Sequence, residues 1–329
     1  MLHLHSVVDR SKPKCESLFM KKYFFIFVSI LAVCCMKAIA APWHPADGSH
    51  QIQIWPRSAP GGQVVNGPEG SEDGGSQVAG KPWTAVFNVT QPTMTVFSPT
   101  EKNTGTAVVV FPGGGYQVLA IDLEGTEICS WLTSKGITCV LLKYRVPHGV
   151  PNRSGPYPKS AAALQDAQRT IGLLRHDYAK WKIDPKKIGV IGFSAGGHLV
   201  AAISTNFKKR LYKTVDDADK ESCRPDFAIA LYPGHMAKDY KPKLGLNPDL
   251  PVSSETPPTL LIHAKNDSVD PVEYSQLYKD ALEKHQVPVE IHLFDKGGHA
   301  FGLRKTEFPI TQWPALAEMW LAKIGMISK

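Results

Sequence analysis

The sequence predicts an α/β fold with a mainly parallel central sheet of about eight strands and helices on both faces. Continuous apolar runs, typical of strands buried on both sides, recur along a chain that is 43% hydrophobic. Amphipathic stretches of helical length separate these runs, as crossover connections between parallel strands require. No internal repeat of about 20 to 50 residues is present, which argues against a propeller domain.

The expected elements alternate regularly. Residues 83–89 and 93–99 predict two strands that pair antiparallel at the entry to the domain. Further strands are expected at 107–111, 137–145, 187–193, 227–232, 259–263 and 287–294. Helices are expected at about 121–135, 159–181, 195–205, 271–285 and 311–326. Irregular segments at 146–158, 206–226 and 233–257 follow strand ends, where open α/β sheets hold ligands. They are candidate walls of a site, although 206–226 is equally well interpreted as a surface connection.

The N-terminal residues indicate a targeting segment. A basic start at Met20, an apolar run over 23–35 and a small-x-small pattern at Ala38–Ala40 predict a signal peptide over 20–40, with a mature chain from about Ala41. Residues 1–19 fit no part of such a peptide and are interpreted as a non-native upstream extension. An uncleaved anchor is the alternative. Residues 41–82 are interpreted as an extended lead-in, with 52–55 as its strand-like run, and 83–329 as the main domain. We expect a secreted or periplasmic protein without stable membrane association after cleavage.

Charge and cysteine content limit the partners and cofactors. The net charge is +7, but the first forty residues hold six Lys or Arg against two Asp or Glu. The remaining +3 gives no reason to expect nucleic acid or an anionic membrane. Beyond the leader only Cys129, Cys139 and Cys223 remain, so at least one is unpaired. Cys129 and Cys139 stand among apolar neighbours, where a free thiol behaves as a small hydrophobic residue. No Cys/His cluster suggests a metal, and no cofactor is expected.

Ser194 is the candidate nucleophile. The pattern Gly-x-Ser-x-Gly over 192–196 is weak by itself, but here it joins a buried strand to a helix of small residues. So tight a turn strains the serine backbone and leaves room only for small residues two positions to either side. It also sets the hydroxyl at a helix N-terminus, where developing negative charge is favoured. A structural serine is the weaker interpretation.

A serine hydroxyl needs a base, and the base needs a carboxylate to orient it. Asp267 follows one predicted strand and His299 follows the last, in the chain order Ser, Asp, His expected for this architecture. Asp270 is a rival acid, but the proline after it favours a position near a helix N-cap. The other histidines near the predicted site fit structural roles better. These are His198, His263 and His292.

The glycine run after the first buried strand, 113–115, predicts an oxyanion hole. Its donors are expected to be the amide of Ala195 and an amide of Gly114 or Gly115, between which the sequence does not choose. A phosphate-binding loop is the competing interpretation. The sequence argues against it, because the glycine run lacks the Lys-Ser/Thr of a P-loop and the spacing of a dinucleotide fingerprint.

Several motifs in this order resemble the α/β-hydrolase superfamily over roughly residues 84–325. They are FPGGGY, KYRVP, LQDAQRTIGLLR, GFSAGGHLVAA, PDFAIALYPG, HAKNDSVDP and GGHAFG. The chain is most similar to secreted bacterial esterases of the acetylxylan- or feruloyl-esterase type. Pro112 stands where the glycine motif of such esterases often carries His, so the loop must be anchored by other groups. The resemblance also implies that Arg145 and Asp166 form a buried structural pair.

The resemblance implies hydrolysis of carboxylic esters by a serine, with small-molecule or polysaccharide esters as substrates, and suggests short acyl groups such as acetyl on carbohydrates. Aromatic residues beside the predicted loops either line a substrate pocket or serve packing. They are Tyr116, Tyr157 and Phe301. Three alternatives stay open: a peptidase of the prolyl-oligopeptidase type, a lipase, and an inactive hydrolase fold that serves as a binding module. The oligomeric state is not indicated by the sequence.

Overall fold

The computed structural model describes residues 42–62, 65–147 and 161–328. The predicted signal peptide, the upstream extension and Tyr157 lie outside these residues. By contact density, Met1–Ala40 and Ala41–Lys329 form separate units, and only the second is described.

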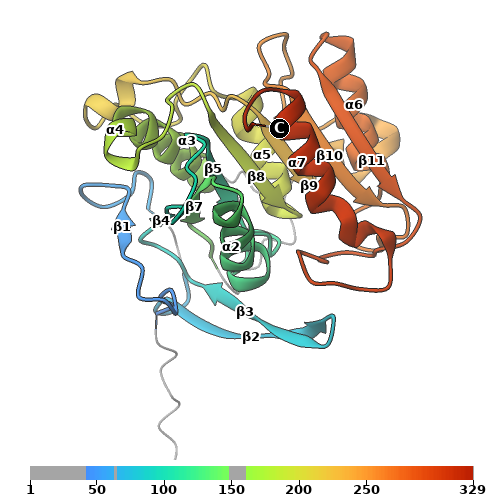
Figure 1. The fold of residues 1–329 in the computed structure, drawn as a ribbon, viewed down its shortest axis with the longest axis horizontal. Coiled ribbons are helices and arrows are strands. Elements are labelled where there is room, and N and C mark those ends of the chain that lie inside the picture. Colours follow the sequence, from blue (N-terminus) through green and yellow to red (C-terminus); the bar gives the residue numbers. More distant parts are fainter. Residues whose placement is uncertain (1–41, 63–64, 148–160, 329) are drawn as a thin grey trace, which may run out of the picture. The chain divides into compact units, whose positions relative to one another are not determined.

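An eight-stranded sheet forms the centre of this unit (Figure 1). Its spatial order is β1-β4-β7-β5-β8-β9-β10-β11. The strands are β1 Gln51–Gln53, β4 Thr93–Phe97, β5 Ala107–Phe111, β7 Thr138–Lys143, β8 Ile188–Phe193, β9 Ala228–Leu231, β10 Thr259–Ala264 and β11 Val289–Phe294. The six strands from β7 to β11 in this order are parallel, and β4 and β1 extend one edge antiparallel. Strands β5, β7 and β8 are buried throughout, as their apolar sequences predict. The predicted fold class is confirmed.

Helices cover the sheet on both faces. They are α2 Glu127–Ser134, α3 Ala161–His176, α4 Tyr178–Trp181, α5 Ala195–Thr205, α6 Glu273–Lys284 and α7 Trp313–Lys323. The connection from β5 to β7 runs toward the β1 edge of the sheet. The next two connections, from β7 to β8 and from β8 to β9, run toward the β11 edge. Right-handed crossovers therefore put α2 on one face and α3 and α5 on the opposite face. Helix α7 joins α2, where Trp131 and Trp313 meet edge to face with ring centroids 5.2 Å apart.

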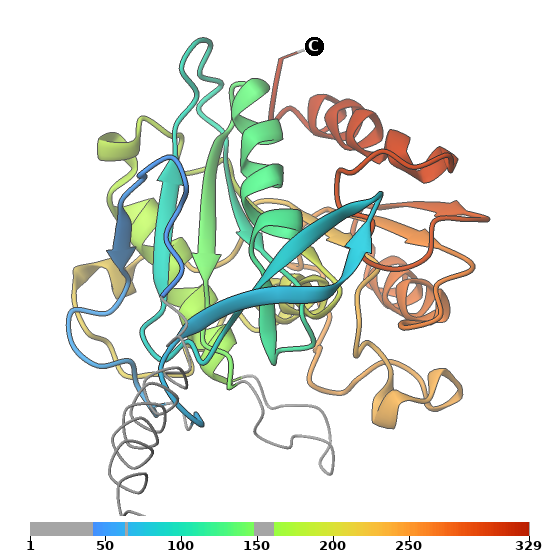
Figure 2. The same cartoon turned by 90° about the horizontal axis from the view of Figure 1, so that it is seen from below.

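A smaller antiparallel sheet corrects the predicted entry to the domain. It comprises β2 Gly70–Val78, β3 Lys81–Phe87 and β6 Val118–Ala120, and its β2–β3 hairpin lies below the central sheet in Figure 1 and crosses in front of it in Figure 2. The prediction that 83–89 pairs with 93–99 is wrong, because β4 has both edges taken by β1 and β7. Strand β2 was not predicted: its sequence is polar and glycine-rich, and most of it is solvent-exposed, so it carries no apolar alternation.

The structure resolves the cysteine pairing that the sequence left open. Cys129 on α2 and Cys139 on β7 form a disulfide, with Cα atoms 5.1 Å apart. The helix folds back onto the strand that follows it, which brings two residues ten positions apart face to face. Cys223 is free and buried, which confirms that one thiol stays unpaired.

Two boundaries differ from those expected. The predicted helix 121–135 begins as a π-helical turn, η1 Asp122–Thr126, before α2. The predicted helix 159–181 divides into α3 and α4 within the residues described. Across the described ranges, no helix combines the length and apolar character that a membrane crossing requires.

Candidate active site

Ser194 occupies the turn between β8 and α5 with φ 51° and ψ −116°, a strained conformation for a residue with a side chain. The residues two positions to either side of Ser194 must be glycine because the turn is tight. A Cβ on Gly192 would lie 2.2 Å from the carbonyl oxygen of Gly196, and a Cβ on Gly196 would lie 2.0 Å from the carbonyl oxygen of Phe111. The steric argument made from the sequence therefore holds in the structure.

Three loops bring the predicted nucleophile, base and acid into contact. Ser194 Oγ lies 3.0 Å from Nε2 of His299, and Nδ1 of His299 lies 2.7 Å from Oδ2 of Asp267. Asp267 follows β10 and His299 follows β11, adjacent parallel strands whose carboxyl ends meet at one edge of the sheet. The arrangement is a continuous hydrogen-bonded chain from hydroxyl to carboxylate, which can take a proton from the serine.

Asp267 is held as a carboxylate by two histidines. Burial by itself would raise the pKa of this group, but hydrogen bonds from His263 and His299 outweigh burial and hold the pKa well below its ordinary value. His263 is fully buried, with Nε2 3.3 Å from Asp267 Oδ2 and Nδ1 2.8 Å from the Ser275 hydroxyl. His263 is thus the packed, hydrogen-bonded residue that the sequence predicts. It also stabilises the ionised form of Asp267.

The glycine loop is anchored by groups that sequence reasoning missed. The amide of Gly113 donates to Oε2 of Glu124 at 2.7 Å, and the carbonyl of Pro112 accepts from the Tyr144 hydroxyl. The other carboxyl oxygen of Glu124 accepts from the Tyr232 hydroxyl at 2.9 Å. These bonds replace the anchoring role that Pro112 cannot fill. The signal for Glu124 was absent because a lone glutamate in a predicted helix is most often a surface residue.

Gly114 and Gly115 border the cavity above Ser194. Because the Gly113 amide is occupied by Glu124, the amides of Gly114 and Gly115 remain the candidate donors of this loop. Both glycines have positive φ, 125° and 62°, so side chains are disfavoured there. Ala195 begins α5, directly after the serine. These are the three positions at which the sequence predicts an oxyanion hole.

The cavity around Ser194 has a volume of about 610 Å³. Its aromatic wall comes from residues not predicted to line it, which are Trp83, His235, Tyr240 and Tyr274. Two of them belong to the irregular segment 233–257, which therefore contributes a wall as expected. Segment 206–226 packs on α3 instead, where Arg169 forms ion pairs with Asp216 and Asp219. Most of 146–158 lies outside the described residues.

Tyr116 and Phe301 are buried beside the cavity and are not part of its lining. The Tyr116 hydroxyl lies 3.1 Å from Nδ1 of His198, and the Phe301 ring packs on Tyr232 with centroids 4.5 Å apart. The structure thus puts both in the packing that the sequence left as their alternative role. His198 is likewise buried, and burial lowers its pKa to about 3, so it stays neutral.

The remaining structural assignments agree with expectation. Arg145 and Asp166 form a fully buried ion pair at 2.9 Å, and the indole of Trp55 donates to the same carboxylate. His292, on β11, pairs with Glu290 at 2.9 Å.

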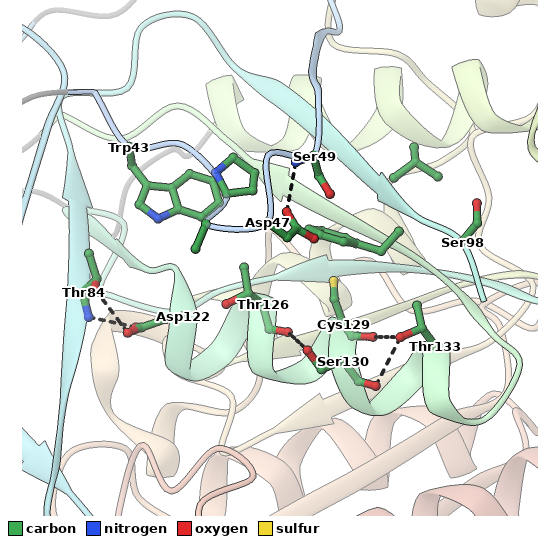
Figure 3. A pocket seen from close by; sticks show the side chains of 14 residues that line it. Trp43, Asp47, Ser49, Thr84, Ser98, Asp122, Thr126, Cys129, Ser130 and Thr133 are labelled. Carbon is green, nitrogen blue, oxygen red and sulfur yellow. Dashed lines mark hydrogen bonds between the residues drawn. The ribbon is translucent and has the colours of Figure 1, made fainter. Parts of the chain in front are cut away.

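A second hollow of about 620 Å³ lies between the segment before β1, the end of β4 and α2 (Figure 3). Its polar groups are used within the fold. Asp122 accepts from the amide and hydroxyl of Thr84, and the hydroxyls of Ser130 and Thr133 donate to carbonyls of their own helix. It shares no lining residue with the first cavity. The candidate site is therefore the cavity that contains Ser194.

Comparisons with known proteins agree with this fold. The sequence profile of the BD-FAE family matches residues 94–235, and that of the prolyl oligopeptidase family matches residues 173–325. The chain is 31% identical over 230 residues to the acetylxylan esterase of Xylanibacter ruminicola, a match that covers 64% of this chain and 43% of that protein. It is 29% identical over 219 residues to endo-1,4-beta-xylanase B of Butyrivibrio fibrisolvens, with 61% and 33% covered. The chain thus spans less than half the length of these two curated relatives.

A solved structure is matched over its entire length. The acetyl ester-xyloside bifunctional hydrolase from Caldicellulosiruptor lactoaceticus superposes with a TM-score of 0.67 and 31% identity, covering 88% of this chain and 100% of that one. These matches confirm the resemblance drawn from the motifs. The chain belongs to the α/β-hydrolase superfamily.

Proposed function

We propose that this protein is a serine hydrolase of carboxylic esters that acts on short-chain, chiefly acetyl, esters of carbohydrates. The observation that carries the proposal is the chain of two hydrogen bonds, 3.0 Å and 2.7 Å long, from Ser194 through His299 to Asp267. The hydroxyl at its start faces a cavity that a substrate can enter.

The geometry supports acyl transfer in two steps. His299 takes the Ser194 proton as the oxygen attacks the ester carbonyl, and the oxyanion is bound by amides of Ala195 and of Gly114 or Gly115. His299 then returns the proton to the leaving alcohol. In the second step the same imidazole activates water, which releases the acid and restores the serine. Asp267 keeps the imidazole oriented and stabilises its charged form.

The substrate class is supported by similarity. The matched relatives are named as an acetylxylan esterase and a xylanase, and the matched structure as an acetyl ester-xyloside hydrolase. Xylan-type acetyl esters are therefore the first substrates to test. Release of acetate from acetylated xylan, compared with hydrolysis of acetyl, butyryl, octanoyl and feruloyl aryl esters, measures the preference. Fastest turnover of the octanoyl ester would identify a lipase instead.

Replacement of the nucleophile tests the mechanism. We expect Ser194→Ala to lower kcat for p-nitrophenyl acetate by at least about 10⁴-fold, because no other group in the arrangement can form the acyl intermediate. A fluorophosphonate probe labels the wild type and not the variant. An unchanged rate would overturn the assignment, and a wild type that neither labels nor turns over would favour a binding module.

A peptidase is the second candidate, since the prolyl oligopeptidase profile matches residues 173–325. The two functions share the serine chemistry and differ in the leaving group. Cleavage of a prolyl p-nitroanilide at a rate comparable to that of the acetyl ester would favour the peptidase.

We propose further that the mature protein functions outside the cytoplasm. Structural disulfides persist in oxidising compartments, and Cys129–Cys139 is one. The predicted signal peptide over 20–40 supports the same location. N-terminal sequencing of the exported protein tests the predicted start near Ala41.

A further inference from the structure

A second carboxylate, that of Asp270, stands beside the reacting atoms. Its Oδ2 lies 3.5 Å from Ser194 Oγ and 3.9 Å from Nε2 of His299, and the residue is part of the cavity lining. Its backbone is fixed by the groups that hold the triad acid. The Asp270 amide donates to Asp267 Oδ1 at 3.0 Å, and Nε2 of His263 lies 3.0 Å from its carbonyl oxygen.

In the hydrolytic mechanism this side chain transfers no proton and forms no covalent bond; it only adds its charge beside His299. Helix α6 begins at Glu273 with Val272 as its N-cap, so Asp270 lies near the N-cap as the sequence predicts, but no side chain caps the helix there. Within the described ranges, no Lys or Arg pairs with the carboxylate, and its one side-chain hydrogen bond is the long contact with Ser194.

Burial makes the ionised form of Asp270 unfavourable in this position. The side chain of Asp270 is only 11% exposed, and burial, the largest influence on the group, raises its pKa to about 6. An acid kept in a cavity with unused acceptor capacity is a group suited to bind a donor on the substrate.

The position of Asp270 indicates which half of a bound ester its carboxylate would contact. The leaving alcohol oxygen must come within about 3 Å of Nε2 of His299 to receive its proton. Asp270 Oδ2 lies 3.9 Å from the same nitrogen, close enough to contact the alcohol half of a bound ester. The acyl oxygen is directed to the amides of the glycine loop and α5. A hydroxyl on the carbon next to the ester-bearing carbon of the alcohol therefore comes within hydrogen-bond reach of Asp270.

We propose that Asp270 determines specificity for the alcohol half of the substrate by accepting a hydrogen bond from a hydroxyl vicinal to the ester. The inference rests on the proposed ester hydrolysis and goes beyond it, because it assigns a substrate-binding residue and a chemical class. That class is the monoesters of vicinal polyols, to which partly acylated sugars belong. Esters of simple alcohols lack the required donor.

A matched pair of substrates isolates this hydrogen bond. Ethylene glycol monoacetate carries the vicinal hydroxyl, and 2-methoxyethyl acetate has it capped by a methyl group. The measured quantity is the ratio of kcat/KM for the two, at mildly alkaline pH where Asp270 is ionised. We expect the wild type to prefer the hydroxylated ester by about tenfold or more, as for a hydrogen bond to a charged acceptor.

Two variants and one control test the assignment. Asp270→Val removes the acceptor with little change of shape and brings the ratio close to one, and Asp270→Asn retains a neutral acceptor and gives an intermediate ratio. Glu273→Gln removes the same charge from an exposed position three residues on and leaves the ratio unchanged. Fluorophosphonate labelling of every variant verifies an intact triad, so failure of the proposed hydrolysis is seen separately. A wild-type ratio near one would overturn the proposal. So would an Asp270→Val variant that slows both esters equally.

Discussion

At the scale of single residues, His299 is the group whose surroundings set the working pH. Burial by itself would lower its pKa, but the hydrogen bond to Asp267, together with the charges of Asp267, Asp270 and Glu124, raises the pKa above its ordinary value. Only the neutral imidazole can accept the serine proton. The acidic neighbours therefore stabilise the imidazolium formed during the reaction. For the same reason they raise the pH that is needed for the imidazole to be neutral and the enzyme active.

This balance predicts the acid limb of the pH profile. For p-nitrophenyl acetate we expect kcat/KM to fall as pH drops through a midpoint above about 6.5, the pKa of an unperturbed histidine. Removing one negative charge in Asp270→Asn lowers the His299 pKa, so the limb moves to lower pH. Glu273→Gln is the control and leaves the limb in place. A limb that moved to higher pH in Asp270→Asn would contradict the electrostatic assignment.

At the scale of elements, the glycine loop after β5 and the π-helical turn η1 form one unit. Glu124 of η1 is 1% exposed and binds the Gly113 amide and the Tyr232 hydroxyl at once. Its carboxyl also sits where a Cβ on Gly113 would collide with it, at 2.6 Å. The turn thus fixes the loop whose next amides face the cavity, and Glu124 acts as a positioning residue.

Replacing Glu124 tests this coupling. Glu124→Ala frees the Gly113 amide and leaves the loop unanchored, so we expect kcat for p-nitrophenyl acetate to fall by about 10²-fold, comparable to the loss of an oxyanion donor, with KM little changed. Glu124→Gln keeps an acceptor for the amide and restores most of kcat. If Ala and Gln variants were equally impaired, the carboxylate charge and not the loop position would be the relevant property. Circular dichroism of both variants verifies folding.

The same scale shows what the sequence could predict and where it failed. Buried parallel strands such as β5 and β8, and the elbow between β8 and α5, follow from apolar continuity and from steric limits on glycine, which are local properties. Strand β2 is polar and exposed, so its pairing with β3 has no local signature. The roles of Glu124 and Asp270 depend on which loops meet in space, and no spacing in the chain encodes that.

At the scale of the whole described unit, the segment before the main domain is built into it. Strand β1 pairs with β4 at the sheet edge, the carbonyl of Ile54 accepts from Arg169 at 2.9 Å, and the indole of Trp55 donates to Asp166. The two hydrogen bonds join residues more than one hundred positions apart in the chain. We infer that the lead-in stabilises the edge that β4 would otherwise expose.

The Cys129–Cys139 bond acts on the stability of this whole unit. It closes a short loop between α2 and β7, both of which pack in the core. Crosslinking a loop of this size restricts the unfolded chain by about 2 to 3 kcal/mol. For a domain of this size such a loss lowers Tm by roughly 3 to 5 °C. We therefore expect a Cys129→Ala/Cys139→Ala double variant to unfold at correspondingly lower temperature than the wild type.

Adding a thiol reductant should lower the Tm of the wild type and not that of the double variant, which separates the crosslink from side-chain packing. Cys223→Ala, which removes the buried free thiol, should keep the wild-type response to reductant. A wild-type Tm that did not respond to reductant during unfolding would mean that the two sulfurs are not bonded in the protein.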